Sequence, residues 1–329
     1  MSVHDSPSSL VLKTDTPVSG SSRAAASAVY ELTKPGITRL VTITSVVGFI
    51  LNAVGQTWET WDLVARAAGC IIGTALSAAG ANALNQWIER ERDANMRRTA
   101  ARPLPSRRLA SGPALAAGLL LSALGLGVLA AVGFAPAVVS LATIAVYTLI
   151  YTPLKPVTPL NTLVGAIPGA LPPLIGWTAA ATGNALHGSG AGFHALAEPG
   201  GWCLFLLMLV WQIPHFLAIA WMYRDDYARG GHRMLPMTDP TGSATGHTVL
   251  IWAIALLPVS AAPAVFMGGR LGWASLLAAG LTGVVFIWLC ARFARERTTP
   301  NARRVFFGSI MHLPVLLIAM VIDALVRAS

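Results

Sequence analysis

Three oxygen-bearing side chains lie four residues apart near the end of an apolar segment. They are Asn85, Glu89 and Asp93, in the stretch NQWIERERD. In an α-helix this spacing keeps all three on one face, because four residues make slightly more than one turn. Carboxylates in an apolar helix are costly unless they bind something. Amide and carboxylate oxygens suit a divalent cation that carries phosphates, so the row predicts a site for Mg²⁺ and a diphosphate.

A second acidic pair, Asp225 and Asp226, follows a later apolar segment. Gln212, His215, Tyr223 and Asp226 are spaced by three or four residues or their multiples, which favours a shared helix face. Two carboxylate sites at one membrane face can hold a diphosphate between them through Mg²⁺, so we interpret Asp225 and Asp226 as further metal ligands. The alternative for the first site is a helix end with ordinary solvated charges.

Basic and aromatic residues accompany both acidic sites. The stretch MRRTAARPLPSRR follows the first site, Arg224 adjoins the second, and Lys155 is the one charge in YTPLKPVTPLN. A lone lysine beside a membrane commonly anchors lipid headgroups, but here we expect it to contact a leaving diphosphate. Breaking a C–O bond to diphosphate also leaves positive charge on carbon, which aromatic faces can stabilise. The candidates for that role are Tyr147, Tyr151, Trp177 and Tyr223.

The elements that must position these residues are membrane-spanning helices. The chain of 329 residues is 54% hydrophobic and only 11% charged, whereas soluble domains carry about 25% charged residues. A spanning helix needs about 20 mostly apolar residues. The sequence therefore predicts an all-α polytopic membrane protein with nine transmembrane helices around a central cavity, at about 37–55, 63–87, 112–132, 135–152, 160–182, 200–222, 246–267, 271–292 and 305–326.

Prolines and glycines within 160–182 predict a broken fifth helix. The sequence also predicts two parts: a disordered cytoplasmic tail over 1–30 and a single transmembrane domain over 31–329. If the N-terminus is cytoplasmic, all basic residues except Arg66, Arg270 and Arg327 fall on the cytoplasmic side. This asymmetry predicts a cytoplasmic N-terminus and a C-terminus on the outer side. It also accounts for the net charge of +9 without a nucleic-acid partner.

Taken together, the motifs resemble the protohaem IX farnesyltransferase (haem O synthase) branch of the UbiA-type intramembrane prenyltransferases. The resemblance runs from LTKPGIT (32–38) to the segment at 306–323 and includes YTPLKPVTPLN (151–161) and WQIPHF (211–216). It implies a helical bundle that uses Mg²⁺ and two substrates, farnesyl diphosphate and haem B. The implied reaction attaches farnesyl to a haem vinyl carbon and adds water.

The resemblance also assigns residues. Asn85, Glu89 and Asp93 match the first acidic motif, where the superfamily usually has Asp in place of Glu89, and Asp226 matches the second. That departure concerns the coordination of the metal more than the activity. The remaining matched positions are Arg97, Arg98, Arg102, Lys155, Asn161 and His215. We expect Lys155 and Tyr223 to be catalytic, and we expect the substrates to be bound by Arg97, Arg98, Arg102, Tyr151, Asn161, Gln212, His215 and Arg224.

Several alternatives stay open from the sequence. The acceptor could instead be an aromatic acid or a chlorin, and other classes are a non-catalytic haem carrier and a transporter. A haem ligand would fit His215 or His312, and the sequence does not choose between them. Docking on a haem A synthase or an oxidase-assembly protein is equally undecided. Without a basic, acid-poor presequence in residues 1–30, we expect a bacterial plasma membrane rather than a mitochondrial one.

Overall fold

The computed structural model describes residues 22–181 and 191–329, and every regular element in these ranges is a helix. Nine helical segments of the described chain are long and apolar enough to cross a membrane, which confirms the nine predicted spans. They are α2 (Pro35–Ala53), α3 (Thr60–Asp93), α4 (Ser111–Val132), α5 (Phe134–Ala145) with η1 (Val146–Tyr151) and α6 (Thr152–Leu154), α7 (Asn161–Ala170) with α8 (Pro172–Ala180), α10 (Pro199–Met222), α13 (Ser243–Phe266), α14 (Trp273–Arg295) and α15 (Thr299–Ala328).

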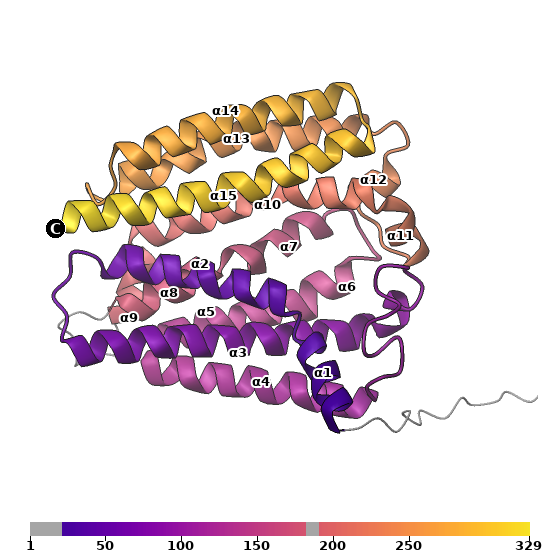
Figure 1. Cartoon of the computed structure of the whole chain (residues 1–329), viewed down its shortest axis with the longest axis horizontal. Coiled ribbons are helices and arrows are strands. Elements are labelled where there is room, and N and C mark those ends of the chain that lie inside the picture. Colours follow the sequence, from indigo (N-terminus) through magenta and orange to yellow (C-terminus); the bar gives the residue numbers. More distant parts are fainter. Residues whose placement is uncertain (1–21, 182–190) are drawn as a thin grey trace, which may run out of the picture.

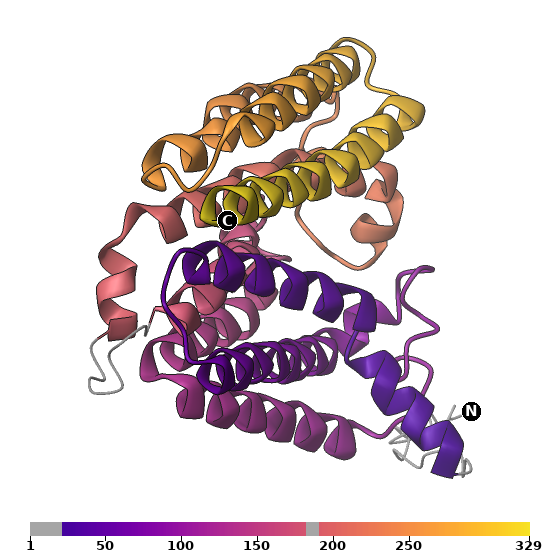
Figure 2. The ribbon, with the colours of Figure 1, turned by 60° about the vertical axis from the view of Figure 1, so that its left-hand side comes forward.

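The long helices run roughly along one axis (Figure 1). Helices α2, α3 and α4 lie on one side of the molecule, α13, α14 and α15 lie on the other, and α7 and α10 lie between them, as a second view confirms (Figure 2). The loop after α3 lies at the same end as two short helices, α11 (Arg224–Arg229) and α12 (Leu235–Thr238). The C-terminus lies at the opposite end. Both acidic motifs therefore belong to one end of the bundle.

Small residues bring α3 and α4 close together. A Cβ atom on Gly125 would lie 2.4 Å from the backbone nitrogen of Ser77, and one on Gly80 would lie 2.3 Å from Oγ of Ser122. Small residues allow such close approach between membrane helices. This packing fixes the axis of α3, and with it the direction of the acidic row.

The fifth span is broken, as predicted. Helix α7 ends at Ala170 and α8 begins at Pro172. The break follows from the proline itself, because Pro172 has no N–H to donate and its ring disfavours a continuous helix. The side chain of Gln212 lies at this break, where its amide donates to the carbonyl of Ala166 at 3.3 Å.

The predicted disordered tail is too long at its C-terminal side. Helix α1 (Ser22–Leu32) covers nine of the residues assigned to the tail. Its sequence SRAAASAVYEL is rich in alanine, the best helix former. Ala28 and Leu32 are fully buried, and Leu32 packs with Ala83 and Ala114. Residues 1–21 lie outside the described part of the chain.

Two very short elements, α9 (Ala191–His194) and η2 (Ala195–Ala197), precede α10.

Candidate active site

The acidic row is buried and each member contacts a basic side chain. Asn85, Glu89 and Asp93 are between 0% and 4% exposed on α3. Nδ2 of Asn85 donates to Oε2 of Glu89 at 2.9 Å, so the row is connected. Oδ1 of Asn85 accepts from Lys34, Glu89 lies 2.7 Å from Nζ of Lys155, and Oδ2 of Asp93 accepts from Arg102 at 2.6 Å.

Lys155 reaches the row from the turn after α6. Nζ of Lys155 donates to Oε2 of Glu89 at 3.0 Å and lies 4.6 Å from the centre of the Tyr151 ring. Burial acts to lower the pKa of Lys155, but the negative charge of Glu89 outweighs it and raises that pKa above its ordinary value. The ion pair with Glu89 therefore favours the cationic form of Lys155. Tyr151 stacks with Tyr147 at 5.7 Å, so two of the four predicted aromatics lie together on this side of the row.

The second acidic motif docks directly onto the loop that follows the first. The backbone N–H groups of Arg97 and Arg98 donate to the two carboxylate oxygens of Asp226 at 3.1 and 3.0 Å. Arg229 donates to the same carboxylate. Burial acts to raise the pKa of Asp226, but the N–H donors of Arg98 and Arg97 and the Arg229 guanidinium lower it overall. The two motifs thus meet at one end of the bundle, as the sequence predicted.

A pocket of about 430 Å³ lies where the motifs meet. Arg97, Arg98, Tyr223, Asp226 and Arg229 are among the residues that line it. The guanidinium carbon of Arg98 lies 5.2 Å from the Tyr223 ring centre. The lining combines cations with an aromatic face, which suits a phosphate group.

Replacing Asp226 with alanine should loosen the contact between the motifs. The N–H groups of Arg97 and Arg98 would lose their charged acceptor, and a hydrogen bond to a charged group contributes about 1.5–3 kcal/mol. We expect faster amide hydrogen exchange over residues 94–110 than in the unsubstituted protein. Asp225→Ala is the matched control, because Asp225 is exposed and its ion pair within the described residues is with Arg224, at 3.8 Å. Equal protection from hydrogen exchange in both variants would contradict the proposal that Asp226 holds the two motifs together.

The structure does not bring every predicted residue to the row. Asp225 lines the pocket where the motifs meet rather than the row, and its side chain is 87% exposed, so its role as a metal ligand stays a prediction. The Arg224 guanidinium lies over the Trp221 ring at 5.1 Å. Trp177 lies toward the opposite end, where its carbonyl accepts from Asn52. Its distance from the acidic row removes it from the candidates for stabilising a cation.

Two predicted substrate ligands make structural hydrogen bonds. Asn161 donates to the carbonyl of Arg233 at 2.8 Å and to that of Thr158. Gln212 donates to the carbonyls of Ala166 and Met208. Both side chains hold neighbouring backbone segments in place, so direct contact of either with a substrate stays a prediction.

Three site residues escaped the sequence reasoning. Lys34 contacts Asn85, and burial together with the charge of Arg102 lowers the pKa of Lys34 to about 7. Thr152 accepts from Nδ2 of Asn85 at 2.9 Å. His232 is buried, and its Nδ1 has no hydrogen-bond partner among the described residues. Of the three, only Lys34 had a signal in the sequence, because it is a charged residue directly before Pro35 and an apolar span.

The row fits a divalent cation. Oε1 of Glu89 is buried without a well-formed hydrogen bond, although Lys155 lies beside it. An oxygen in that state is a suitable ligand for a hard cation, as are the neighbouring oxygens of Asn85 and Asp93. The described residues contain no group of three His, Cys, Asp or Glu side chains that could hold a metal on its own. Mg²⁺ typically retains water and phosphate ligands, so one or two protein carboxylates suffice.

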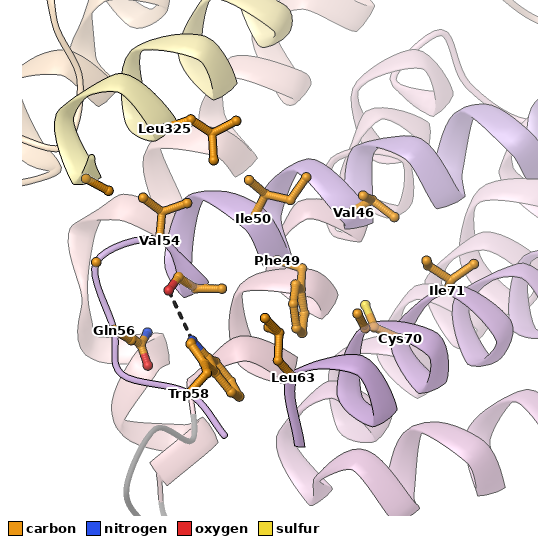
Figure 3. A pocket seen from close by; sticks show the side chains of 14 residues that line it. Val46, Phe49, Ile50, Val54, Gln56, Trp58, Leu63, Cys70, Ile71 and Leu325 are labelled. Atoms are coloured by element: carbon orange, nitrogen blue, oxygen red, sulfur yellow. Dashed lines mark hydrogen bonds between the residues drawn. The ribbon is translucent and has the colours of Figure 1, made fainter. Parts of the chain in front are cut away.

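A second pocket, of about 490 Å³, lies at the other end of the bundle. Apolar side chains line it, among them Phe49, Ile50, Leu63 and Leu325 from α2, α3 and α15 (Figure 3). Trp58 closes one edge, where its Nε1 donates to the carbonyl of Ala53 at 3.1 Å. This pocket contains no residue of the acidic row.

Comparison with known proteins identifies relatives of this arrangement. The model of the UbiA prenyltransferase family matches residues 41–311. A protoheme IX farnesyltransferase of Solibacter usitatus is 44% identical over 300 residues, which cover 89% of this chain and 97% of that protein. The structure of digeranylgeranylglyceryl phosphate synthase in membranes superposes with a TM-score of 0.72 at 16% identity, over 91% of this chain and 98% of that one. A UbiA homologue from Archaeoglobus fulgidus, bound to GPP and Mg²⁺, gives a TM-score of 0.61 at 11% identity, over 89% and 99%.

Proposed function

Because the chain belongs to the UbiA prenyltransferase family, we propose that it transfers a farnesyl group from farnesyl diphosphate to a vinyl carbon of haem B. The observation that carries this proposal is the buried oxygen row on α3, faced by Lys34, Lys155 and Arg102. The match to a protoheme IX farnesyltransferase over nearly its full length supports the choice of donor and acceptor.

The proposed reaction breaks the C–O bond between the prenyl carbon and the diphosphate, which leaves with the electron pair. A C–C bond then forms to the vinyl carbon, and water adds to the resulting haem carbocation with loss of a proton, which gives the hydroxyethylfarnesyl group of haem O. Lys155, Arg97 and Arg102 stabilise the charge that develops on the leaving oxygens. The faces of Tyr147 and Tyr151 stabilise the positive carbon.

We assign Asn85, Glu89 and Asp93 as ligands for Mg²⁺, with Asp226 holding the second motif against the site. When bound, Mg²⁺ would neutralise charge on the diphosphate. A related fold from Archaeoglobus fulgidus binds GPP with Mg²⁺, which supports the same requirement here. Arg97 and Arg98 bind the diphosphate from the pocket where the motifs meet.

Replacing Lys155 with alanine should raise the Michaelis constant for farnesyl diphosphate about tenfold or more, because a charge-assisted hydrogen bond contributes about 1.5–3 kcal/mol. Steady-state kinetics at saturating Mg²⁺ measure this effect. Arg303→Ala is the control, since Arg303 is an exposed cation at the start of α15. An unchanged Michaelis constant in the Lys155 variant would remove Lys155 from the diphosphate site.

A panel of acceptors tests the identity of the second substrate. Purified protein receives farnesyl diphosphate with haem B, an aromatic acid or a chlorin, and the products are identified by mass. We expect product from haem B alone. Product from the aromatic acid or the chlorin, with none from haem, would overturn the proposed acceptor.

The nine apolar helices make the chain an integral membrane protein. From the distribution of lysine and arginine we propose that the acidic end faces the cytoplasm, with the C-terminus outside, in a bacterial plasma membrane. A haem A synthase or oxidase-assembly partner stays a prediction from the sequence.

A further inference from the structure

Two of the three histidines on the spanning helices are shielded from solvent, and their hydrogen bonds differ. His215 belongs to α10 and His312 to α15. Each has Nδ1 close to a hydroxyl of another helix. The difference lies at Nε2, which is the ring nitrogen left for a metal when Nδ1 is hydrogen-bonded.

His312 has no free ring nitrogen. Thr282 donates its one hydroxyl proton to the carbonyl of Ala278 at 2.5 Å, so its oxygen must accept from Nδ1–H of His312 at 2.7 Å. Nε2 of His312 then accepts from the hydroxyl of Ser260 at 3.2 Å. The side chain is buried and both nitrogens are satisfied, so His312 has a structural role.

His215 has its tautomer fixed with Nε2 unoccupied. Ser309 donates its hydroxyl proton to the carbonyl of Phe306 at 2.6 Å. Oγ of Ser309 must therefore accept from Nδ1–H of His215, at 2.7 Å, which leaves the lone pair on Nε2. Nε2 of His215 forms no hydrogen bond with the described residues. This atom is also not fully buried, so part of its surface is accessible.

The imidazole ring of His215 is held rigidly between two aromatic rings. Trp211 stacks on one side at 4.9 Å and 21°, and Phe306 stacks at 5.1 Å and 26°. Nε1 of Trp211 donates to the carbonyl of Ser309 at 2.8 Å, which ties the same two helices together. An imidazole with Nδ1–H donated to an oxygen and Nε2 presented outward is the usual arrangement of a metal-binding histidine.

The position of His215 suits an acceptor that must reach the acidic end. His215 lies seven residues before Met222, the last residue of α10, which is about 10 Å along the helix axis. Gln212 contacts α7 while His215 contacts α15, and α10 lies between the two groups of helices (Figure 1). A porphyrin held at this position would lie on the helix that leads to the second acidic motif.

We propose that Nε2 of His215 is an axial ligand of the haem iron, and that Ser309 is the positioning residue that fixes the ring. The assignment rests on the proposed function, since it takes haem as the acceptor. It supplies what the acidic row lacks, namely a fixed point for the second substrate.

Haem spectroscopy of the full-length protein in detergent tests the assignment without turnover. Haem B is titrated into the unsubstituted protein, His215→Ala, His215→Gly, His312→Gln and His247→Ala, and the ferric and ferrous absorption bands are recorded. We expect His215→Ala to lose the spectrum of nitrogen-ligated iron and to bind haem at least about tenfold more weakly. Added imidazole should restore that spectrum in His215→Gly. His247 is exposed near the start of α13, so its variant should match the unsubstituted protein.

A separate measurement tests the positioning role of Ser309. Ser309→Ala should weaken haem binding by up to about tenfold and shift the ferrous bands, because Nδ1–H loses its acceptor. Ser309→Thr retains the hydroxyl and should restore the original bands.

Three outcomes would overturn the assignment. The first is an unchanged spectrum in His215→Ala, and the second is loss of binding in His215→Gly that imidazole does not restore. The third is an equal spectral change in His312→Gln. Failure of the proposed function is distinguishable, because it would leave the His215-dependent spectrum intact while the unsubstituted protein formed no farnesylated haem.

Discussion

Asp93→Asn should reduce prenyl transfer by at least about 10²-fold while haem binding is retained. The substitution keeps the shape of the side chain and an oxygen for Arg102, which lies 2.6 Å from Oδ2 of Asp93. It removes one of the two negative charges of the row, and with it a strong oxygen ligand for Mg²⁺. Turnover by mass spectrometry and haem titration by absorbance measure the two properties separately.

The matched control for Asp93→Asn is Asp62→Asn. Asp62 lies on the same helix, α3, and also pairs with an arginine, Arg66, at 2.8 Å, but it is in the first turn at the opposite end. This variant should turn over normally. A haem carrier would deliver haem equally well with either substitution, so a selective loss in Asp93→Asn separates an enzyme from a carrier.

Glu89→Gln should have an effect of similar size for a different reason. Glu89 and Lys155 form a buried ion pair, and loss of one charge leaves the other uncompensated at a cost of about 3–5 kcal/mol. The buried Oε1 that we assign to Mg²⁺ would also lose its charge. We expect kcat/KM for farnesyl diphosphate to fall at least about 10²-fold.

Glu89→Asp is the informative companion variant. It retains the charge and shortens the side chain by one methylene group, which restores the residue that the wider superfamily usually has. We expect it to keep activity within about tenfold of the unsubstituted protein. If Glu89→Gln were as active as Glu89→Asp, charge at this position would not matter and the assigned ligand set would be wrong.

The sequence predicted those features that depend on one helix at a time. Spans follow from the length of apolar segments, and the shared face of Asn85, Glu89 and Asp93 follows from their spacing. The break in the fifth span followed from its prolines. The helix at Ser22–Leu32 was missed because its polar, serine-containing surroundings resemble a disordered tail, and its stability depends on burying Leu32 against other helices.

The sequence could not predict contacts between distant segments. Lys34 and Asn85 are 51 positions apart, and Arg97 and Asp226 are 129 apart. Helical periodicity describes which residues share a face, but not which face of another helix they meet. For the same reason the choice between His215 and His312 required the hydroxyl partners on α15, α13 and α14.

The most direct measurement is farnesyl transfer with and without the divalent metal. Purified protein in lipid receives haem B and farnesyl diphosphate, and the reaction is run in Mg²⁺, in EDTA, and in EDTA followed by excess Mg²⁺. The haem products of each reaction are identified by mass spectrometry. We predict a product heavier than haem B by one farnesyl group and one hydroxyl group in Mg²⁺, almost none in EDTA, and recovery on adding Mg²⁺ back. Undiminished product in EDTA would contradict the central claim that the oxygen row on α3 acts by holding a metal–diphosphate complex.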